Sequence, residues 1–285
     1  MKNKKKNPKN MILKFEELSW KKIDALNRDK TIFFLPIAPM EEHGPHLPVG
    51  TDYLIIRDAT YEAIKILNKK KPDLTYVVLP SVPLGFCDFN TDFPGSISVS
   101  GKTVGDVVYS FGRSLGEHGF KYLVICTYHM ALIHLKGIYN AMKKLRSRYK
   151  MKIVEPWGPY FYSGEIEKNE PKLGFDTKKE IHAGFRETSL MKYLYPYLVD
   201  ESYKKLQSIY RDTSSPRVLG KKFKQLGLKD GYIGSPNRAN ADYGRWFYNE
   251  TVKAIVNSTI DMYNGKKTRG LSRYIKTAMK ALFWR

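Results

Sequence analysis

The residues of this chain that could do chemistry are concentrated in the segment 35–52, which holds Glu41, His43 and Asp52 within twelve positions. This segment follows residues 31–34, a β-branched and aromatic run that predicts a buried parallel strand. The three side chains are therefore expected just beyond the carboxyl end of a strand, where open α/β sheets build their sites. Two carboxylates and an imidazole without a thiolate are typical ligands of zinc, manganese or iron(II).

An ordinary surface loop is the alternative interpretation of this segment. Such loops are also rich in acidic residues, prolines and glycines. Here Gly44, Pro45, Pro48 and Gly50 restrict the backbone, and a second histidine, His46, lies among them. The density of ligand types directly after an apolar strand favours a metal site.

A second candidate ligand follows another predicted strand. His129 comes three residues after the apolar run 122–126, so it is expected at the same sheet edge as the first group. Residues 52–67 carry apolar side chains at helical spacing, which places Asp52 at a helix N-terminus. This convergence argues against His129 being a core histidine.

Periodicity predicts that these groups are positioned by alternating strands and helices, which indicates an α/β fold with a mostly parallel central sheet. Strands are expected at residues 31–37, 76–80, 122–126 and 153–154. Helices are expected at residues 15–28, 52–67, 103–118, 132–149, 182–197 and 240–263. The aromatic segment 157–175 either packs in the core, which we favour, or caps the site.

Composition adds a statement about partners. The chain has 285 residues and 42% hydrophobic content, enough for one large domain or two small ones, and no composition shift divides it. The formal net charge of +21 favours acidic ligands, nucleic acid or anionic lipid, although a general lysine bias would produce the same excess. No nucleic-acid-binding module is recognisable, so we expect no nucleic acid partner.

The expected location is the cytoplasm. Cys87 and Cys126 cannot form a disulfide framework and lack metal-knuckle spacing. The basic residues 1–14 are expected to be disordered and do not form a signal peptide, and no stretch approaches the ~20 apolar residues of a membrane span.

The C-terminal residues 265–285 predict a basic amphipathic helix beyond a main domain of residues 15–264. Its apolar positions are Leu271, Tyr274, Ile275, Ala278, Met279, Leu282 and Phe283. Such a helix can lie on an anionic membrane surface, making the protein peripheral to the membrane, or dock on its own domain or a neighbouring subunit. Both alternatives are open.

Four motifs resemble those of the creatininase (creatinine amidohydrolase) family. Residues 41–48, Glu-Glu-His-Gly-Pro-His-Leu-Pro, followed by Thr-Asp at 51–52, are similar to its Glu-Gln-His-Gly-Pro-His-Leu-Pro and Thr-Asp signature. Residues 93–98 resemble its Phe-Pro-Gly-Thr-Ile-Ser, and residues 182–189 match its His-Ala-Gly-x-x-Glu-Thr-Ser. Residues 231–244 resemble its last motif, so the likeness covers roughly residues 15–263.

The resemblance implies a three-layer α/β/α fold and two divalent ions per chain, zinc or manganese or both, with iron as an alternative. One ion would be held by Glu41, Asp52 and His129. The other would be held by His43, Asp52 and Glu187, so that Asp52 bridges the two. Ions about 3.5–4 Å apart share a hydroxide at neutral pH. His182 would be the catalytic residue that protonates the departing nitrogen, and Glu187 would be needed for catalysis as a ligand.

The activity implied is hydrolysis of a non-peptide C–N bond in a small cyclic amide or formamide, by an enzyme that forms homo-oligomers, hexamers in the family. A phosphorylated or otherwise anionic substrate would suit the positive charge. The sequence departs from the family at two places. Residues 127–132 read Thr-Tyr-His-Met-Ala-Leu instead of Asn-Gly-His-Gly-Gly-Asn, and Asn90 stands where the family commonly has histidine. The added Cβ atoms at Tyr128, Met130 and Ala131 are expected to narrow the space around His129.

These departures motivate the alternative of a catalytically weakened, metal-binding family member with a structural or regulatory role. A simple anion or nucleic-acid binder, suggested by charge alone, is the other alternative.

Overall fold

The computed structural model describes residues 12–212 and 220–282. Within them, one parallel sheet of five strands has the order β1-β3-β2-β4-β5. The strands are β1 (Leu13–Lys14), β2 (Thr31–Pro36), β3 (Thr75–Val78), β4 (Tyr122–Cys126) and β5 (Lys152–Val154). Apart from the added β1, the strands lie where the periodicity predicts them, with ends that differ by one or two residues.

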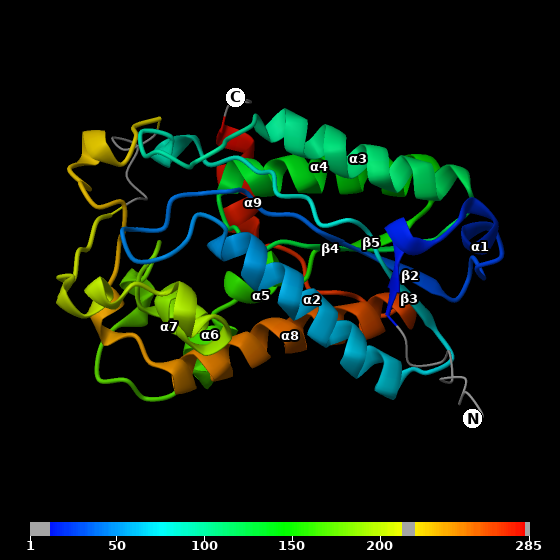
Figure 1. Cartoon of the computed structure of the whole chain (residues 1–285). Coiled ribbons are helices and arrows are strands. Elements are labelled where there is room, and N and C mark those ends of the chain that lie inside the picture. Colours follow the sequence, from blue (N-terminus) through cyan, green and yellow to red (C-terminus); the bar gives the residue numbers. More distant parts are fainter. Residues whose placement is uncertain (1–11, 213–219, 283–285) are drawn as a thin grey trace.

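Helices cover both faces of this sheet. They are α1 (Trp20–Asp24), α2 (Thr51–Lys70), α3 (Gly101–Glu117), α4 (Leu132–Tyr149), α5 (Trp157–Phe161), α6 (Glu165–Asn169), α7 (Phe185–Leu194), α8 (Ala241–Tyr263) and α9 (Arg273–Ala281). Helices α3 and α4 lie on one face, and α2 and α8 lie on the other (Figure 1). This is the three-layer α/β/α fold expected from the sequence.

Strand β2 shows why the central strands are apolar throughout. Ile32 and Phe34 enter the core on the α2 and α8 side, whereas Phe33 and Leu35 enter the core beneath α3 and α4. All four side chains are fully buried. A parallel strand with both faces covered requires such a continuous apolar run.

Helices α3 and α4 approach each other closely through glycines. An added Cβ at Gly105 would lie 2.9 Å from the Gly137 carbonyl oxygen, and one at Gly137 would overlap the Gly101 carbonyl oxygen. Close contact of the two backbones is therefore possible only because these positions lack side chains.

The N-terminal prediction was partly wrong. Instead of one helix over residues 15–28, the chain forms a 3₁₀ turn (Phe15–Glu17) and the short helix α1, because the extended Ser19 separates them and caps α1 by accepting from the Lys22 N–H. Leu13–Lys14, assigned above to a disordered extension, pairs with β3 as strand β1. Residues 1–11 lie outside the described part of the chain.

The aromatic segment after β5 packs in the core, as favoured above. It forms α5 and α6, and Trp157 stacks on Tyr128 with ring centroids 5.7 Å apart. Trp157 also meets Phe247 of α8 edge to face at 5.6 Å. The segment therefore packs between the residues that follow β4 and helix α8.

The C-terminal helix α9 is shorter than predicted and docks on the protein itself. Leu271, Ile275 and Met279 are buried against Leu135 of α4. The apolar face that would enter a membrane surface is thus covered, and among the described residues of that face only Tyr274 is largely exposed, at 74%. Phe283 lies outside the described residues. Among the described helices, none combines the length and apolar composition needed to cross a bilayer.

Candidate metal centre

The five candidate ligands converge at the carboxyl edge of the sheet. Glu41 and His43 lie in the loop after β2, and Asp52 lies in the first turn of α2. His129 follows β4, and Glu187 lies in the first turn of α7. Two ligand groups result, Glu41 with Asp52 and His129, and His43 with Asp52 and Glu187, with the ligand atoms of each group within 4.8 Å of one another. Asp52 belongs to both groups.

His129 presents a lone pair to two carboxylates. Its Nε2–H donates to the Phe86 carbonyl oxygen at 2.8 Å, so in the neutral ring Nδ1 carries the lone pair. That Nδ1 lies 2.9 Å from Glu41 Oε2 and 2.9 Å from Asp52 Oδ2. Three acceptor atoms facing one another in a buried site require a shared proton or a cation between them.

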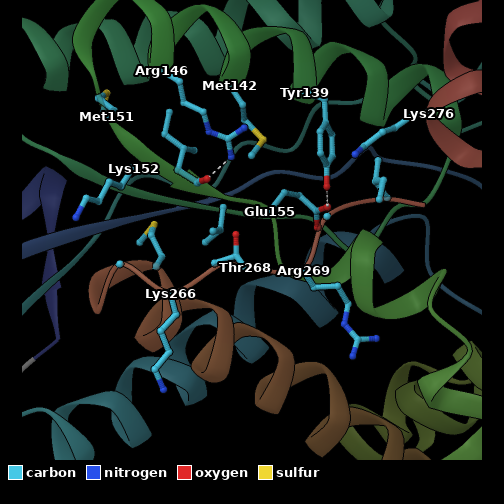
Figure 2. Close-up of a pocket in the computed structure, with 16 residues that line it drawn as sticks. Tyr139, Met142, Arg146, Met151, Lys152, Glu155, Lys266, Thr268, Arg269 and Lys276 are labelled. Atoms are coloured by element: carbon cyan, nitrogen blue, oxygen red, sulfur yellow. Dashed lines mark hydrogen bonds between the residues drawn. The ribbon is translucent and has the colours of Figure 1, made fainter. Parts of the chain in front are cut away.

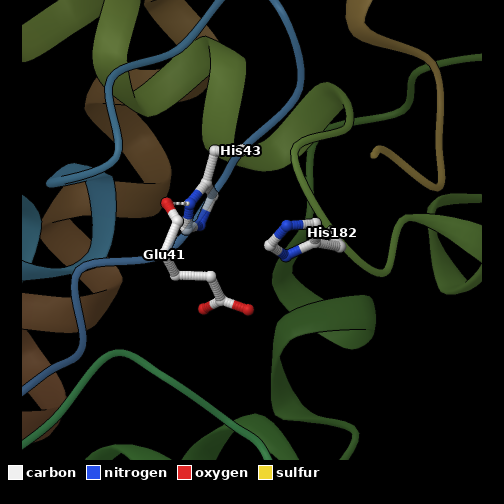
Figure 3. Close-up of side chains that lie close together, drawn as sticks. All are labelled: Glu41, His43 and His182. Atoms are coloured by element: carbon white, nitrogen blue, oxygen red, sulfur yellow. Dashed lines mark hydrogen bonds between the residues drawn. The ribbon is translucent and has the colours of Figure 1, made fainter. Parts of the chain in front are cut away.

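His43 is oriented in the same way toward the second group. Its Nδ1–H donates to the Glu41 carbonyl oxygen at 2.9 Å, as Figure 3 shows. Nε2 then points to Asp52 Oδ1 at 3.4 Å and to Glu187 Oε2 at 3.8 Å. Ring nitrogens fixed by a backbone carbonyl on the far side are typical of histidine ligands.

The pKa values of these buried groups are set by burial and by the charges of their neighbours. Burial alone would lower the pKa of His129, but the Glu41 charge and the contacts with Asp52 raise it well above its ordinary value. Burial raises the pKa of Glu187 to about 7, against the smaller opposing effect of His43. A cation in the centre would remove the need for histidine protonation, so the donor set fits divalent metal ions.

Asn90 has a role that the sequence did not reveal. Its Nδ2 donates to Glu41 Oε1 at 2.8 Å and contacts the Glu42 carbonyl oxygen at 3.2 Å, and the residue is fully buried. The amide holds one oxygen of Glu41, while the other oxygen, Oε2, faces His129. Asn90, which stands where the family commonly has histidine, therefore orients the candidate ligand Glu41.

His182 lies beside this centre. Its Nε2–H donates to the Glu42 carbonyl oxygen at 2.7 Å, and its ring centroid is 4.4 Å from that of His43. Burial, followed by the His43 charge, lowers the pKa of His182 to about 4. Glu41, His43 and His182 also form a third group with ligand spacing (Figure 3). The geometry therefore allows His182 to carry protons or to bind an ion.

A strained residue lies two positions before the helix that carries Glu187. Ala183 has φ of 49°, a left-handed conformation that is uncommon for a residue with a side chain. Its N–H donates to Glu187 Oε2 at 2.5 Å. The strained turn therefore holds the carboxylate next to His43.

His46 does not join the centre. Its Nε2 lies 2.8 Å from Thr188 Oγ1, which links the loop after β2 to α7. Burial lowers the pKa of His46 to about 4, so the ring is neutral. His46 is a buried structural contact rather than a candidate ligand.

Aromatic side chains cover the centre. Phe89 stacks on His129 with centroids 6.2 Å apart, and Phe223 contacts both Phe89 and His182 at 5.4 Å. The Phe223 N–H donates to the Phe89 carbonyl oxygen at 2.6 Å. Nothing in the sequence pattern singles out these residues, because each lies in a segment without periodicity.

The side chain of Tyr128 does not fill the centre, in contrast to the expectation that the residues around His129 narrow it. Its ring is buried in the core against Trp157. Met130 likewise packs with the apolar residues around α9 and α4. Tyr128 and Met130 therefore pack in the core, and the Tyr128 hydroxyl stays within electrostatic reach of Glu187 and Asp52.

Known proteins resemble this chain over most of its length. A family model described as creatininase, creatinine amidohydrolase, matches residues 16–259. A creatinine amidohydrolase of Pseudomonas putida is 28% identical over 198 residues, 65% of this chain and 72% of that protein. A mycofactocin precursor peptide peptidase of Mycolicibacterium smegmatis is 23% identical over 228 residues, 78% of this chain and 81% of that protein.

Solved structures show the same fold. A creatininase described as a manganese form has a TM-score of 0.69 at 23% identity, covering 89% of this chain and 99% of its own. A creatininase mutant of Zn–Zn type has a TM-score of 0.68 at 22% identity over the same shares. From the match of the family model over most of the sequence, the chain belongs to the creatininase family of amidohydrolases, which hydrolyse C–N bonds.

Proposed function

We propose that this protein is a metal-dependent amidohydrolase that holds two divalent ions on either side of Asp52. The observation that carries the proposal is the orientation of the two histidines. His129 Nδ1 faces Asp52 Oδ2, and His43 Nε2 faces Asp52 Oδ1. One carboxylate whose two oxygens each meet a different imidazole lone pair suits a bridging ligand.

Glu41 and His129 would complete one ligand set, and His43 and Glu187 the other. Zinc and manganese are the metals we propose, since creatininases in both forms share the fold, and iron suits the same donors. Bound there, the ions would supply a hydroxide at neutral pH and polarise the scissile carbonyl.

The chain's own residues would position and move the proton. The Glu42 carbonyl oxygen holds the Nε2–H of His182, which leaves Nδ1 free to accept a proton. We propose that His182 delivers this proton to the departing nitrogen. Phe89 and Phe223, which cover His129 and His182, would exclude bulk water from the reaction.

The substrate is a compound with an amide C–N bond. The sequence alone limited this to non-peptide amides, but the peptidase relatives do not support that limit. We therefore propose a class that includes cyclic amides, formamides and short peptides. A net charge of +21 favours anionic members of this class, including phosphorylated ones.

Metal content and turnover test the proposal together. Asp52→Ala should empty both sites in elemental analysis and abolish hydrolysis of a panel containing creatinine, formamides and short peptides. Asp106→Ala, which removes an exposed carboxylate on α3, is the matched control and should change neither the metal content nor the rate of hydrolysis. Unchanged metal content in Asp52→Ala would refute the bridging role.

Two further variants separate ligand from proton carrier. Glu187→Gln should lose metal and activity, because a ligand charge is removed. His182→Ala should keep its metal and slow turnover by about 10²–10⁴-fold, the usual contribution of a positioned acid or base. Loss of metal in His182→Ala would instead assign the residue as a ligand.

The second candidate function is a catalytically weakened, metal-binding family member with a structural or regulatory role, suggested by the replaced residues around His129. It would be established if the wild type bound two ions and remained as inert as Glu187→Gln on the whole panel. We also propose a homo-oligomeric, cytoplasmic protein. Cys87 and Cys126 are buried free thiols, which suits a reducing compartment.

A further inference from the structure

A cavity lies at the β5 edge of the sheet, apart from the candidate metal centre. It has a volume of about 580 Å³ and is bounded by α4, β5, the loop 265–271 and α9 (Figure 2). Its lining includes none of the five candidate metal ligands. It therefore needs its own explanation.

The floor of this cavity is apolar. Met142, Met151, Met262 and Leu271 line it, and each is largely buried. Methionine side chains are flexible and polarisable, so such a floor adapts to apolar groups of different shape.

The rim is strongly cationic. The lining side chains include Arg146, Lys152, Lys266, Arg269 and Lys276, with Glu155 as the acidic residue among them. Arg269 lies 3.6 Å from Glu165, which is outside the cavity. Both carboxylate oxygens of Glu155 accept hydrogen bonds, from the N–H groups of Trp157 and Gly158 and from the Tyr139 hydroxyl. The acid is thus satisfied locally and does not neutralise the rim.

Arg146 is the group that most directly implies an anion. Its guanidinium donates to the Ile153 carbonyl oxygen, which uses few of its five N–H donors. Burial lowers the pKa of Arg146, and Tyr139 opposes that effect. Figure 2 shows the Arg146 guanidinium directed toward β5 and the Lys276 side chain extending from α9, with Tyr139 between the two in this view. A guanidinium with spare donors and no carboxylate partner among the described residues is suited to a bidentate anion.

The free edge of β5 adds a backbone donor. Lys152 bonds toward β4 through its N–H to the Lys121 carbonyl oxygen. Successive residues of a strand bond to opposite sides, so the N–H and C=O of Ile153 point into the cavity. The contact of Arg146 with the Ile153 carbonyl oxygen agrees with this direction. The hydroxyl of Thr268 points toward the same space (Figure 2).

We propose that this cavity binds a small ligand in which a phosphate or carboxylate group is joined to an apolar body. Arg146 holds the anionic group, with the Ile153 N–H and the Thr268 hydroxyl as further donors, and Lys276 adds positive charge at the rim. The methionine floor receives the apolar part. The site is separate from the metal centre and does not depend on the proposed hydrolysis.

Calorimetric titration of the full-length protein with hexyl phosphate tests this assignment, with inorganic phosphate and hexanol as partial ligands. Hexyl phosphate should bind saturably at one site per chain, and more tightly than either partial ligand. Arg146→Gln should weaken binding by about 10-fold, the effect of losing a charge-assisted contact, and Lys276→Gln should weaken it by a smaller factor through the loss of a nearby positive charge. Arg148→Gln, an exposed position on the same helix, is the matched control and should bind like the wild type.

Phosphate could also bind at the metal centre, so Asp52→Asn is included and should leave hexyl phosphate affinity unchanged. The assignment is overturned if Arg146→Gln and Lys276→Gln both bind like Arg148→Gln, if Asp52→Asn alone abolishes binding, or if hexanol binds as tightly as hexyl phosphate. Absence of saturable binding to the wild type overturns it as well. Lys276→Gln lies on an exposed position, so the test remains decisive if Arg146→Gln does not fold.

Discussion

The orientation of the candidate ligands is set by backbone carbonyl groups. The Phe86, Glu41 and Glu42 carbonyl oxygens accept from His129, His43 and His182, respectively. Each bond fixes which ring nitrogen faces the centre. Residue types and spacing predicted four of the candidate ligands and the family resemblance added Glu187, but carbonyl groups are present at every position. These partners could not be predicted from sequence for that reason.

Replacing Asn90 tests the contribution of side-chain support. In Asn90→Ala, Glu41 Oε1 loses its amide donor, so the carboxylate should lose its fixed direction toward His129. We expect metal affinity to fall by about 10–100-fold, as for other residues that orient a ligand. Competition with a chelator measures this affinity. The control is Asn68→Ala, which replaces a different buried asparagine, in α2, and should leave metal affinity unchanged. An equal loss of metal affinity in both variants would indicate general destabilisation.

Glu155 should make stability depend on pH. Burial raises its pKa from 4.5 to about 7, against the bonds from Gly158, Tyr139 and Trp157. The folded state therefore holds a proton that the unfolded chain releases near pH 4.5, and the stabilisation is full below that value and lost as the pH rises through about 7. The free energy of unfolding of the wild type relative to Glu155→Gln should fall by on the order of 3 kcal/mol between pH 4 and pH 8. Denaturant titrations at the two pH values measure this difference, and a constant difference would contradict the assignment.

Periodicity predicted the strands that are buried on both faces and the helices that bury one apolar stripe. Helix α4 and strand β4 have the predicted ends, Leu132–Tyr149 and Tyr122–Cys126. The N-terminal region differed because a single cap, Ser19, interrupts an apolar spacing that otherwise suits a helix. Strand β1 has only two residues, too few to show any period.

The contact between α3 and α4 gives a prediction for helix packing. Gly137→Ala would place a methyl group against the Gly101 carbonyl oxygen. In an exposed helix this change would stabilise by about 1 kcal/mol, but overpacking should reverse the sign and cost about 1–3 kcal/mol. Urea denaturation measures the free energy of unfolding. Ser147→Ala on the solvent side of α4 is the control, and an equal gain in both variants would show that the helices separate without cost.

At the scale of the whole molecule, the exposed apolar side chains are consistent with assembly. Ile97 is 64% exposed and Tyr197 is 78% exposed. We expect a homo-oligomer, a hexamer if it follows the family. Light scattering at micromolar concentration should give a multiple of the 33.0 kDa chain mass, and a stable monomer would contradict this.

The wide separation of the ligands along the chain has a consequence for how the protein matures. A chain emerging from the ribosome has Glu41 and Asp52 long before His129, and it has His129 long before Glu187. Neither set is complete in a fragment that ends before β4, and the second set closes only when α7 docks beside the loop after β2. Because metal binding is coupled to the fold that assembles the ligands, ion capture should follow the formation of the sheet. Uptake of the second ion would then mark the arrival of α7, one of the late events of folding.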